Sequence, residues 1–281
     1  MKRFLFITHL TPRAKRTPLR QSLIGIYEKA LLAQSYPHWQ VLQIGEEEKR
    51  SGNFVEVQTT AGTREEGFEQ LRRIYARPDV RELISAADYI IKLDDDDIIS
   101  PGILEKAAQF DFDCYYDEQH TFYDISSGII TQQQRPWIAS TCIHRKVCAF
   151  DRYTGPGASP LENLLYSDHS KAWHTYYAGK KKQIADPAYP VYLRVLSPSS
   201  ITSSTGNAAP ETFRDVAFDR YYAYLKTFGY WKPAAVNGFD VYKPLLSGAW
   251  EKFSGQKQMP VPGTGFADRV SDRIRSLWKK S

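Results

Sequence analysis

Short apolar segments alternate with longer amphipathic segments along the first hundred residues of the chain. The short segments are rich in β-branched and aromatic side chains, which is typical of buried strands. They cover residues 3–8, 39–44, 54–58 and 89–93. From Pro18 onward apolar side chains recur at helical spacing, and residues 64–86 predict helix with a break near Pro78. Strands that alternate with helices predict an α/β protein, with a mostly parallel central sheet and helices on both faces.

The second half of the chain continues this pattern less regularly. We expect strands or a hairpin at residues 113–116, 121–123 and 128–133, and a further strand at 189–195. We expect helices at residues 103–110, 168–178 and 211–228. Ser167 is the predicted N-cap of the second of these helices, and Gly179 is its predicted stop.

The last thirty residues have a different composition. Residues 254–265 are rich in Gly, Pro and Gln, which is typical of a linker. Residues 266–281 place apolar side chains at helical spacing among five basic residues, which predicts a basic amphipathic helix. Such a helix is a candidate for peripheral contact with an anionic membrane surface. The alternative is a terminal helix that docks on its own domain.

Length and composition set limits on the class of protein. The chain has 281 residues, enough for one large domain or for one domain with an extension, and its formal net charge of +5 is only mildly basic. Its three cysteines lack C-x-x-C spacing, so neither a disulfide framework nor a zinc site is expected, and a reducing compartment is the default. No segment reaches the length of a membrane span, and no nucleic-acid-binding motif is present. We therefore expect a cytoplasmic protein without a nucleic-acid partner.

Four consecutive aspartates, Asp94 to Asp97, are the strongest chemical signal in the sequence. They follow the apolar segment 89–93, and we expect Ser100 to cap a helix with Pro101 in its first turn. The acids then occupy the turn at the carboxyl end of a strand, where open α/β sheets bind ligands. Adjacent carboxylates repel by about 1 kcal/mol in water and by roughly 4 kcal/mol at an effective dielectric of about 20. A bound Mg²⁺ or Mn²⁺ removes this repulsion, whereas the alternative is a solvated acidic turn.

The order of several motifs resembles the inverting, family-2-like glycosyltransferases of the GT-A fold over roughly residues 3–205. Gln34-Ser-Tyr, followed by Trp39-Gln-Val, is similar to the family's Q-T/S-Y-x-x-x-E-V, and residues 87–97 are similar to its G-E-Y-I-x-x-L-D-x-D-D. Ser167-Asp168 stands at the family's E-D pair, and residues 192–202 resemble its closing segment. The resemblance implies a Rossmann-like GT-A domain that uses a nucleotide-sugar donor.

The resemblance also assigns roles to individual residues. The family's D-x-D corresponds to Asp94 and Asp96, which would hold Mn²⁺ or Mg²⁺ against the donor diphosphate. Asp94 would also contact the donor. Because four acids are consecutive, Asp95 and Asp97 are alternatives for these two roles. Asp168 would be the general base that deprotonates the acceptor hydroxyl, with Glu162 as the runner-up.

The ends of the first two strands would bind the nucleotide. These positions carry Thr11, Arg13 and Glu46, and Glu46 replaces the family's usual aspartate. Arg64 and Arg77 are candidates for a base edge or a phosphate, because a guanidinium group suits both. Asp95 completes the expected substrate-binding set. Trp137 and Trp173 are candidates for stacking on a sugar ring.

The sequence therefore predicts a metal-dependent glycosyltransferase that moves a monosaccharide from a nucleotide-sugar donor to a glycan or lipid-linked acceptor with inversion. We expect a catalytic domain at residues 1–205, with a nucleotide-sugar half at 1–97 and an acceptor half at 98–205, and a C-terminal helical extension at 206–281. Two alternatives are a nucleotidyltransferase that makes sugar nucleotides and an inactive GT-A-like binding domain. Residues 9–17 carry basic side chains but lack the glycines of a nucleotidyltransferase phosphate loop.

Overall fold

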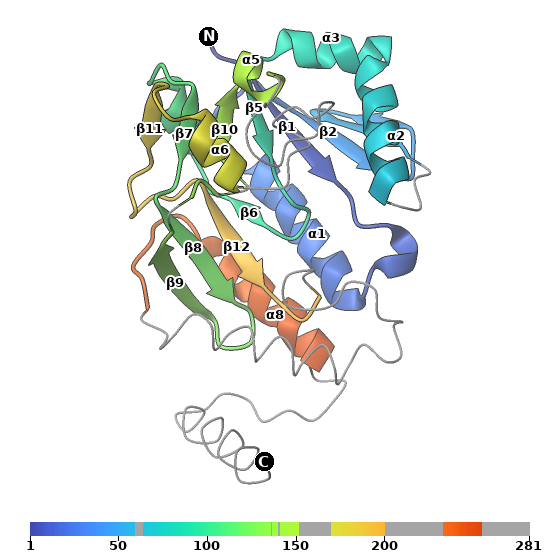
Figure 1. The fold of residues 1–281 in the computed structure, drawn as a ribbon. Helices are drawn as coiled ribbons and strands as arrows, with labels where there is room; N and C mark the ends of the chain where they lie inside the picture. The colour runs from blue at the N-terminus through green and yellow to red at the C-terminus, as the bar shows by residue number, and fades with distance from the viewer. Residues whose placement is uncertain (60–63, 136, 140, 152–169, 200–232, 255–281) are drawn as a thin grey trace, which may run out of the picture.

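A computed structural model describes residues 1–59, 64–135, 137–139, 141–151, 170–199 and 233–254. The chain is an α/β protein in which helices flank an eight-stranded, mostly parallel sheet, as the sequence predicts, and a smaller four-stranded sheet lies beside it (Figure 1). Among the described residues, none of the helices combines the length and the apolar character that a membrane crossing requires.

The large sheet has the strand order β11-β7-β10-β5-β1-β2-β4-β3. Its strands are β1 (Phe4–His9), β2 (Trp39–Gly45), β3 (Lys49–Ser51), β4 (Phe54–Gln58), β5 (Tyr89–Lys92), β7 (Cys114–Tyr116), β10 (Ile143–Arg145) and β11 (Lys182–Ile184). The neighbours β4, β2, β1 and β5 run parallel, whereas β10 is antiparallel to both β5 and β7. The carboxyl ends of the four parallel strands therefore lie at one edge of the sheet, where ligands bind in such folds.

The central strand β1 is covered on both faces. Phe4, Leu5, Phe6 and Ile7 are each at most 2% exposed. A strand that is buried on both faces needs a continuous apolar run, because successive side chains point to opposite sides. The apolar run at the start of the chain is thus a strand, as predicted.

Helices cover both faces of this sheet (Figure 1). They are α1 (Pro18–Leu32), α2 (Arg64–Ala76), α3 (Pro78–Ala86), α4 (Ile103–Ala108), α5 (Lys146–Ala149), α6 (Ser170–Tyr176) and α8 (Lys243–Ser254), with 3-10 turns η1 (Arg13–Lys15) and η2 (Asp240–Tyr242). Thr17 caps α1 because its hydroxyl accepts a hydrogen bond from the Arg20 amide at 3.1 Å. Pro18 occupies the first turn of α1, and Pro78 separates α2 from α3, as the sequence predicts.

The smaller sheet has the order β6-β12-β8-β9. Its strands are β6 (Ile98–Ile99), β12 (Tyr192–Leu196), β8 (Gln119–Asp124) and β9 (Ile129–Gln134). The last two form the predicted hairpin, whose turn contains Gly128 at φ +71°. The two-residue strand β6 follows the acidic turn directly and pairs with β12. This pairing connects the acidic turn to the second sheet.

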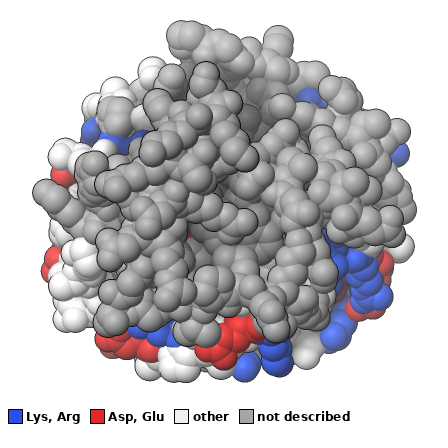
Figure 2. Space-filling model, turned by 90° about the horizontal axis from the view of Figure 1, so that it is seen from below, with Lys and Arg blue, Asp and Glu red and all other residues white. Residues whose placement is uncertain are grey.

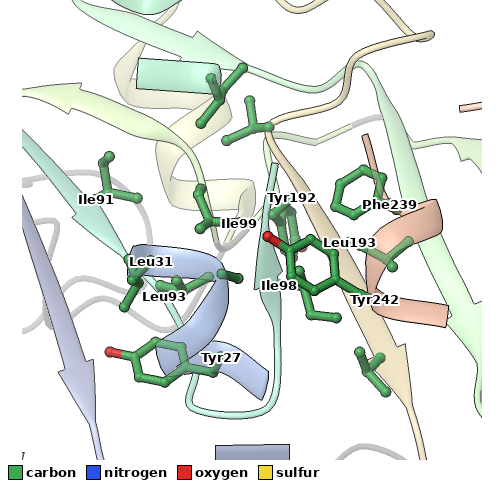
Figure 3. Packing of buried hydrophobic residues seen from close by; sticks show 14 of the residues in the cluster. Tyr27, Leu31, Ile91, Leu93, Ile98, Ile99, Tyr192, Leu193, Phe239 and Tyr242 are labelled. Carbon is green, nitrogen blue, oxygen red and sulfur yellow. The ribbon is translucent and has the colours of Figure 1, made fainter. Parts of the chain in front are cut away.

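Residues 233–254 complete the main hydrophobic core. Phe239 and Tyr242 lie beside Leu193 of β12 (Figure 3), and α8 packs against α1. Leu246 is fully buried in the same cluster as the β1 residue Phe6. The described part of the expected C-terminal extension therefore shares one core with the sheet.

Several predicted elements lie outside the described residues. They are the first residues of the helix predicted at 168–178, the helix at 211–228, most of the linker at 254–265 and the amphipathic helix at 266–281. The prediction at 168–178 overlaps with α6, which begins at Ser170.

Candidate functional site

The four aspartates lie in the turn between β5 and β6. Strand β5 ends at Lys92 and pairs in parallel with β1, so the turn begins at the carboxyl edge of the sheet, as predicted. The amide of Asp97 donates a hydrogen bond to the carbonyl oxygen of Asp94 at 3.1 Å, which closes the turn.

The predicted cap of the following helix was wrong, although the helix begins at Ile103 as expected. The Ser100 hydroxyl caps no helix: the N-cap is Gly102, which adopts φ +70° and offers no side chain. The Ser100 amide instead donates a hydrogen bond to the Val191 carbonyl oxygen at 2.9 Å. The chain thus inserts β6 before α4, because residues 98 and 99 find a strand partner in β12.

The four carboxylates differ sharply in exposure. Asp94 is exposed to solvent, whereas Asp95, Asp96 and Asp97 are 0%, 8% and 3% exposed. The sequence left open which acids of the run face a ligand. Burial now separates Asp94 from the three that follow.

Asp95 fastens the acidic turn to the loop that follows β1. One of its carboxylate oxygens accepts a hydrogen bond from the Thr11 amide at 2.7 Å, and the other accepts one from the Thr11 hydroxyl at 3.1 Å. The predicted substrate residues Thr11 and Asp95 are therefore in direct contact. Their hydrogen bonds hold two segments that are far apart in sequence at the same edge of the sheet.

Arg20 joins two of the acids from the first turns of α1. Its two terminal nitrogens donate to Asp95 and to Asp96, and its side chain is only 9% exposed. A guanidinium fork is suited to bridging two carboxylates, and its charge offsets their repulsion. Sequence reasoning missed Arg20, because its one local feature is its place in the first turns of a predicted helix. Only the packing of α1 beside β5 and β6 reveals its partners.

Asp96 and Asp97 sit in low-dielectric surroundings. Burial raises the pKa of Asp96 to about 6, although the charge of Arg20 opposes this shift. Burial also raises the pKa of Asp97 well above its usual range, and the nearby Asp96 adds to the shift. Asp97 accepts a hydrogen bond from the Val195 amide of β12 at 3.1 Å. Keeping Asp96 ionised in the folded protein therefore costs free energy, and a nearby cation lowers that cost.

The loops after β1 and β2 lie against each other. The amide of Arg13 donates to the Glu46 carboxylate at 2.9 Å, and the Arg13 guanidinium is ion-paired with Glu47. One carboxylate oxygen of Glu56 on β4 accepts hydrogen bonds from the amides of both Glu46 and Glu47, each at 3.1 Å. The structure thus brings Arg13 and Glu46, two of the candidate nucleotide-binding residues, into contact. Sequence reasoning missed Glu56, which holds the second loop in place.

The other predicted residues are not joined to this cluster by the described contacts. Arg77 pairs with Glu48 at 2.5 Å and with Asp79 at 2.9 Å. The side chain of Arg64, the first residue of α2, and both candidate bases, Asp168 and Glu162, lie outside the described residues.

The two candidate stacking tryptophans have different surroundings. Trp173 is 1% exposed and packs edge-on against His144 at 4.7 Å between ring centroids, so stacking of a sugar on its ring was a wrong expectation. Trp137 is half-buried, and the Arg135 guanidinium lies 5.5 Å from its ring.

Charged groups of both signs lie at the rim of the face seen from below (Figure 2). Figure 2 views the molecule from below, and the described Lys, Arg, Asp and Glu side chains are interspersed around the rim of that face. The mixture agrees with the small net charge of the chain, +5. It gives no single-sign patch among the described residues visible in that view.

The sequence matches no protein-family model and no curated protein. Among solved structures the chain is similar to a fragment of TarS from S. aureus, with a TM-score of 0.40 and 14% identity over 92% of this chain and 81% of that chain. It is also similar to the apo-form glycosyltransferase GlyE from Streptococcus pneumoniae TIGR4, with a TM-score of 0.37 and 10% identity over 81% of this chain and 64% of that chain. A third is the galactosyltransferase LgtC, with a TM-score of 0.34 and 9% identity over 76% and 95% of the two chains. These scores are too low to carry an inference about activity.

Proposed function

We propose that this protein is a metal-dependent glycosyltransferase of the GT-A type, which transfers a monosaccharide from a nucleotide-sugar donor to a glycan or lipid-linked acceptor with inversion. The observation that carries the proposal is the turn Asp94–Asp97 at the carboxyl edge of the parallel strands, fastened through Asp95 to Thr11. The motif order in the sequence supports the same assignment.

The chemistry of the turn fits a hard divalent cation. Asp94 presents its carboxylate to solvent, and Asp96 follows two residues later in a largely buried position. Carboxylate oxygens are the ligands that Mg²⁺ and Mn²⁺ prefer, and the raised pKa of Asp96 marks a site where added positive charge is stabilising. When bound, the metal would neutralise charge on the leaving nucleoside diphosphate.

The chain's own residues divide the remaining work. In the proposal Asp94 and Asp96 hold the metal, and Thr11, Arg13 and Glu46 line the nucleotide site at the ends of β1 and β2. Asp95 was expected to bind substrate directly, but its hydrogen bonds to Thr11 favour a positioning role.

Three further assignments rest on the sequence alone. Asp168 is proposed as the general base that takes the acceptor hydroxyl proton, and Arg64 and Arg77 as donor contacts. The boundary between a catalytic domain at 1–205 and an extension at 206–281 also stays a proposal. So do a cytoplasmic location and peripheral membrane contact through residues 266–281.

The first test is a thermal-shift screen of UDP, GDP, TDP and CMP with and without Mn²⁺ on the full chain. A ligand that binds only the folded state raises the melting temperature by mass action. We expect one nucleotide to stabilise the protein, and to do so more strongly with Mn²⁺. No shift with any of them would contradict the proposal.

The second test measures hydrolysis and transfer of the matching nucleotide-sugar. We expect Asp96→Asn and Asp168→Asn each to lose activity by about 10²-fold or more. Asp240→Asn is the control, since Asp240 is exposed and, among the described contacts, its ion pair is with Lys243 three residues later. Full activity in either of the first two variants would defeat that residue's assignment. Release of pyrophosphate instead of a nucleoside diphosphate would identify a nucleotidyltransferase.

A further inference from the structure

Two cysteines and a histidine meet in the protein interior, away from the acidic turn in sequence. Cys114, Cys142 and His144 are each 0% exposed. One ligand atom from each of the three lies within 4.8 Å of the other two. The sequence had indicated no zinc site, because Cys114 is far from the other two along the chain and no C-x-x-C spacing is present.

The pairing of two antiparallel strands creates this cluster. Cys114 of β7 stands directly opposite His144 of β10 in the strand register. Cys142 precedes His144 by two residues, and side chains two apart along an extended segment point to the same face. All three side chains therefore project from one face of the sheet as a direct result of the register.

Helix α6 and the turn after it close this face. The Tyr177 hydroxyl lies 2.6 Å from Nδ1 of His144, and the Trp173 ring packs edge-on against the imidazole. The other ring nitrogen, Nε2, lies 3.2 Å from the sulfur of Cys142. Nδ1 lies 3.8 Å from the same sulfur, so both ring nitrogens are close to Cys142. If Nδ1 donates its proton to the Tyr177 hydroxyl oxygen, Nε2 is the nitrogen left to bind a metal, as in metal-binding histidines whose other nitrogen makes a hydrogen bond.

We propose that Cys114, Cys142 and His144 form a zinc site, which the function proposed above does not require. Binding of Zn²⁺ releases two thiol protons to solvent, and two thiolates with one neutral imidazole leave the complex with no net charge. A neutral complex suits the surroundings, where Ile138 and Trp173 pack against the cysteines. Thiolate and imidazole ligands select Zn²⁺ over Mg²⁺ and Mn²⁺, so this site differs in chemistry from the acidic turn. The three side chains would supply three of the four ligands of a tetrahedral Zn²⁺ site.

The site would brace the part of the sheet that supports the proposed active site. It links β7 to β10, and β10 pairs with β5, which leads into the acidic turn. Through Tyr177 it also fixes the end of α6, whose first residue, Ser170, follows Asp168 by two positions in the sequence. The role assigned to the zinc is structural.

The test begins with the unmodified full chain, purified with zinc present. We expect elemental analysis to find one zinc ion per chain after dialysis, and a strong chelator to lower the melting temperature. Replacement of zinc by Co²⁺ is expected to produce a sulfur-to-cobalt charge-transfer band with the visible spectrum of tetrahedral cobalt. Metal-free protein without that band would overturn the proposal, as would peptide mapping that finds a Cys114–Cys142 disulfide.

Matched serine variants then locate the ion. Cys114→Ser and Cys142→Ser are expected to lose the bound zinc and the cobalt band. Cys148→Ser is the control, because Cys148 is buried in the same cluster but does not belong to the ligand group, and we expect it to retain the metal. Loss of zinc only in the control would refute the assignment. If the first two variants fail to fold, the cobalt spectrum of the unmodified chain still decides, and the nucleotide screen tests the proposed function separately.

Discussion

Replacement of Arg20 by methionine tests the electrostatic balance of the acidic turn. Methionine keeps an apolar side chain of similar length but removes the cation that touches Asp95 and Asp96. Both carboxylates are at most 8% exposed, so water cannot take the place of the guanidinium without rearrangement. Asp95 and Asp96 then lose the cation that bridges them, although Arg194 still acts on the pKa of Asp96.

The expected cost follows from these contacts. Removing one partner of a buried ion pair typically destabilises a protein by about 3–5 kcal/mol. Asp95 keeps its two hydrogen bonds from Thr11, and Asp96 loses the cation that it contacts directly but still feels the charge of Arg194. We therefore expect the lower end of the range, about 3 kcal/mol, at neutral pH, which is a large share of a typical stability of about 5–15 kcal/mol.

Urea-induced unfolding in the presence of a chelator measures this difference. The control is Arg50→Met on the exposed strand β3, which we expect to change stability by no more than about 0.5 kcal/mol.

The pKa of Asp96, already raised to about 6, rises further in the Arg20 variant, so the folded variant binds a proton that the unfolded chain does not. The stability deficit of the variant should therefore shrink as the pH falls from neutral to about 5. Mn²⁺ should restore part of the loss at neutral pH, because it supplies positive charge to the same acids. A deficit below about 1 kcal/mol, or one that does not change with pH, would refute this account.

Three further substitutions test other contacts. Burial raises the pKa of Asp117 to about 8, so ionisation of Asp117 favours the unfolded chain and stability falls as the pH rises through about 4 to 8. Asp117→Asn should remove this pH dependence. Urea midpoints of the variant that follow the same pH curve as the unmodified chain would contradict this prediction. Gly45→Ala should lower the free energy of unfolding, measured thermally, by about 1–3 kcal/mol, because the added methyl group would collide with the Glu56 carboxylate. Gly25→Ala should instead raise it by roughly 0.4–1 kcal/mol, because the space around Gly25 in α1 is open. Equal effects of the two substitutions would refute the reasoning. Tyr177→Phe should weaken zinc binding about 10-fold or more in competition with a chromogenic chelator, since it removes the hydrogen bond to Nδ1 of the ligand histidine, and unchanged affinity would argue against that role.

The pattern of side chains along the sequence correctly predicted elements that depend on their own residues. The apolar run of β1 and the capped, amphipathic α1 follow from side-chain spacing and from Thr17 and Pro18, and both are confirmed. Strand β6 was missed and Ser100 was wrongly expected to cap α4, because β6 forms only through its pairing with β12 almost a hundred residues later. Sequence spacing carries no information about such a partner.

The same distinction holds for the candidate site, because some of its residues could be predicted from the sequence and others could not. Asp94 to Asp97 were visible as a run of like charges after a strand, and their position at the sheet edge follows from strand order alone. Arg20 and Glu56 were not visible, because each acts through a contact with a residue on another element. The cysteine and histidine cluster was hidden for a related reason, since it depends on which residue of β7 faces which residue of β10.

The sequence by itself determined elements such as β1, β5 and α1 and the place of the acidic turn, because these depend on neighbours within a few residues. Only the tertiary structure decided which acid faces solvent and which are fixed inside. Asp95 is held by Thr11 and Asp97 by Val195, and parallel pairing or sheet contact brings these partners from distant segments. The same contacts set the burial that shifts the pKa of Asp96, so its electrostatic state is a property of the folded chain.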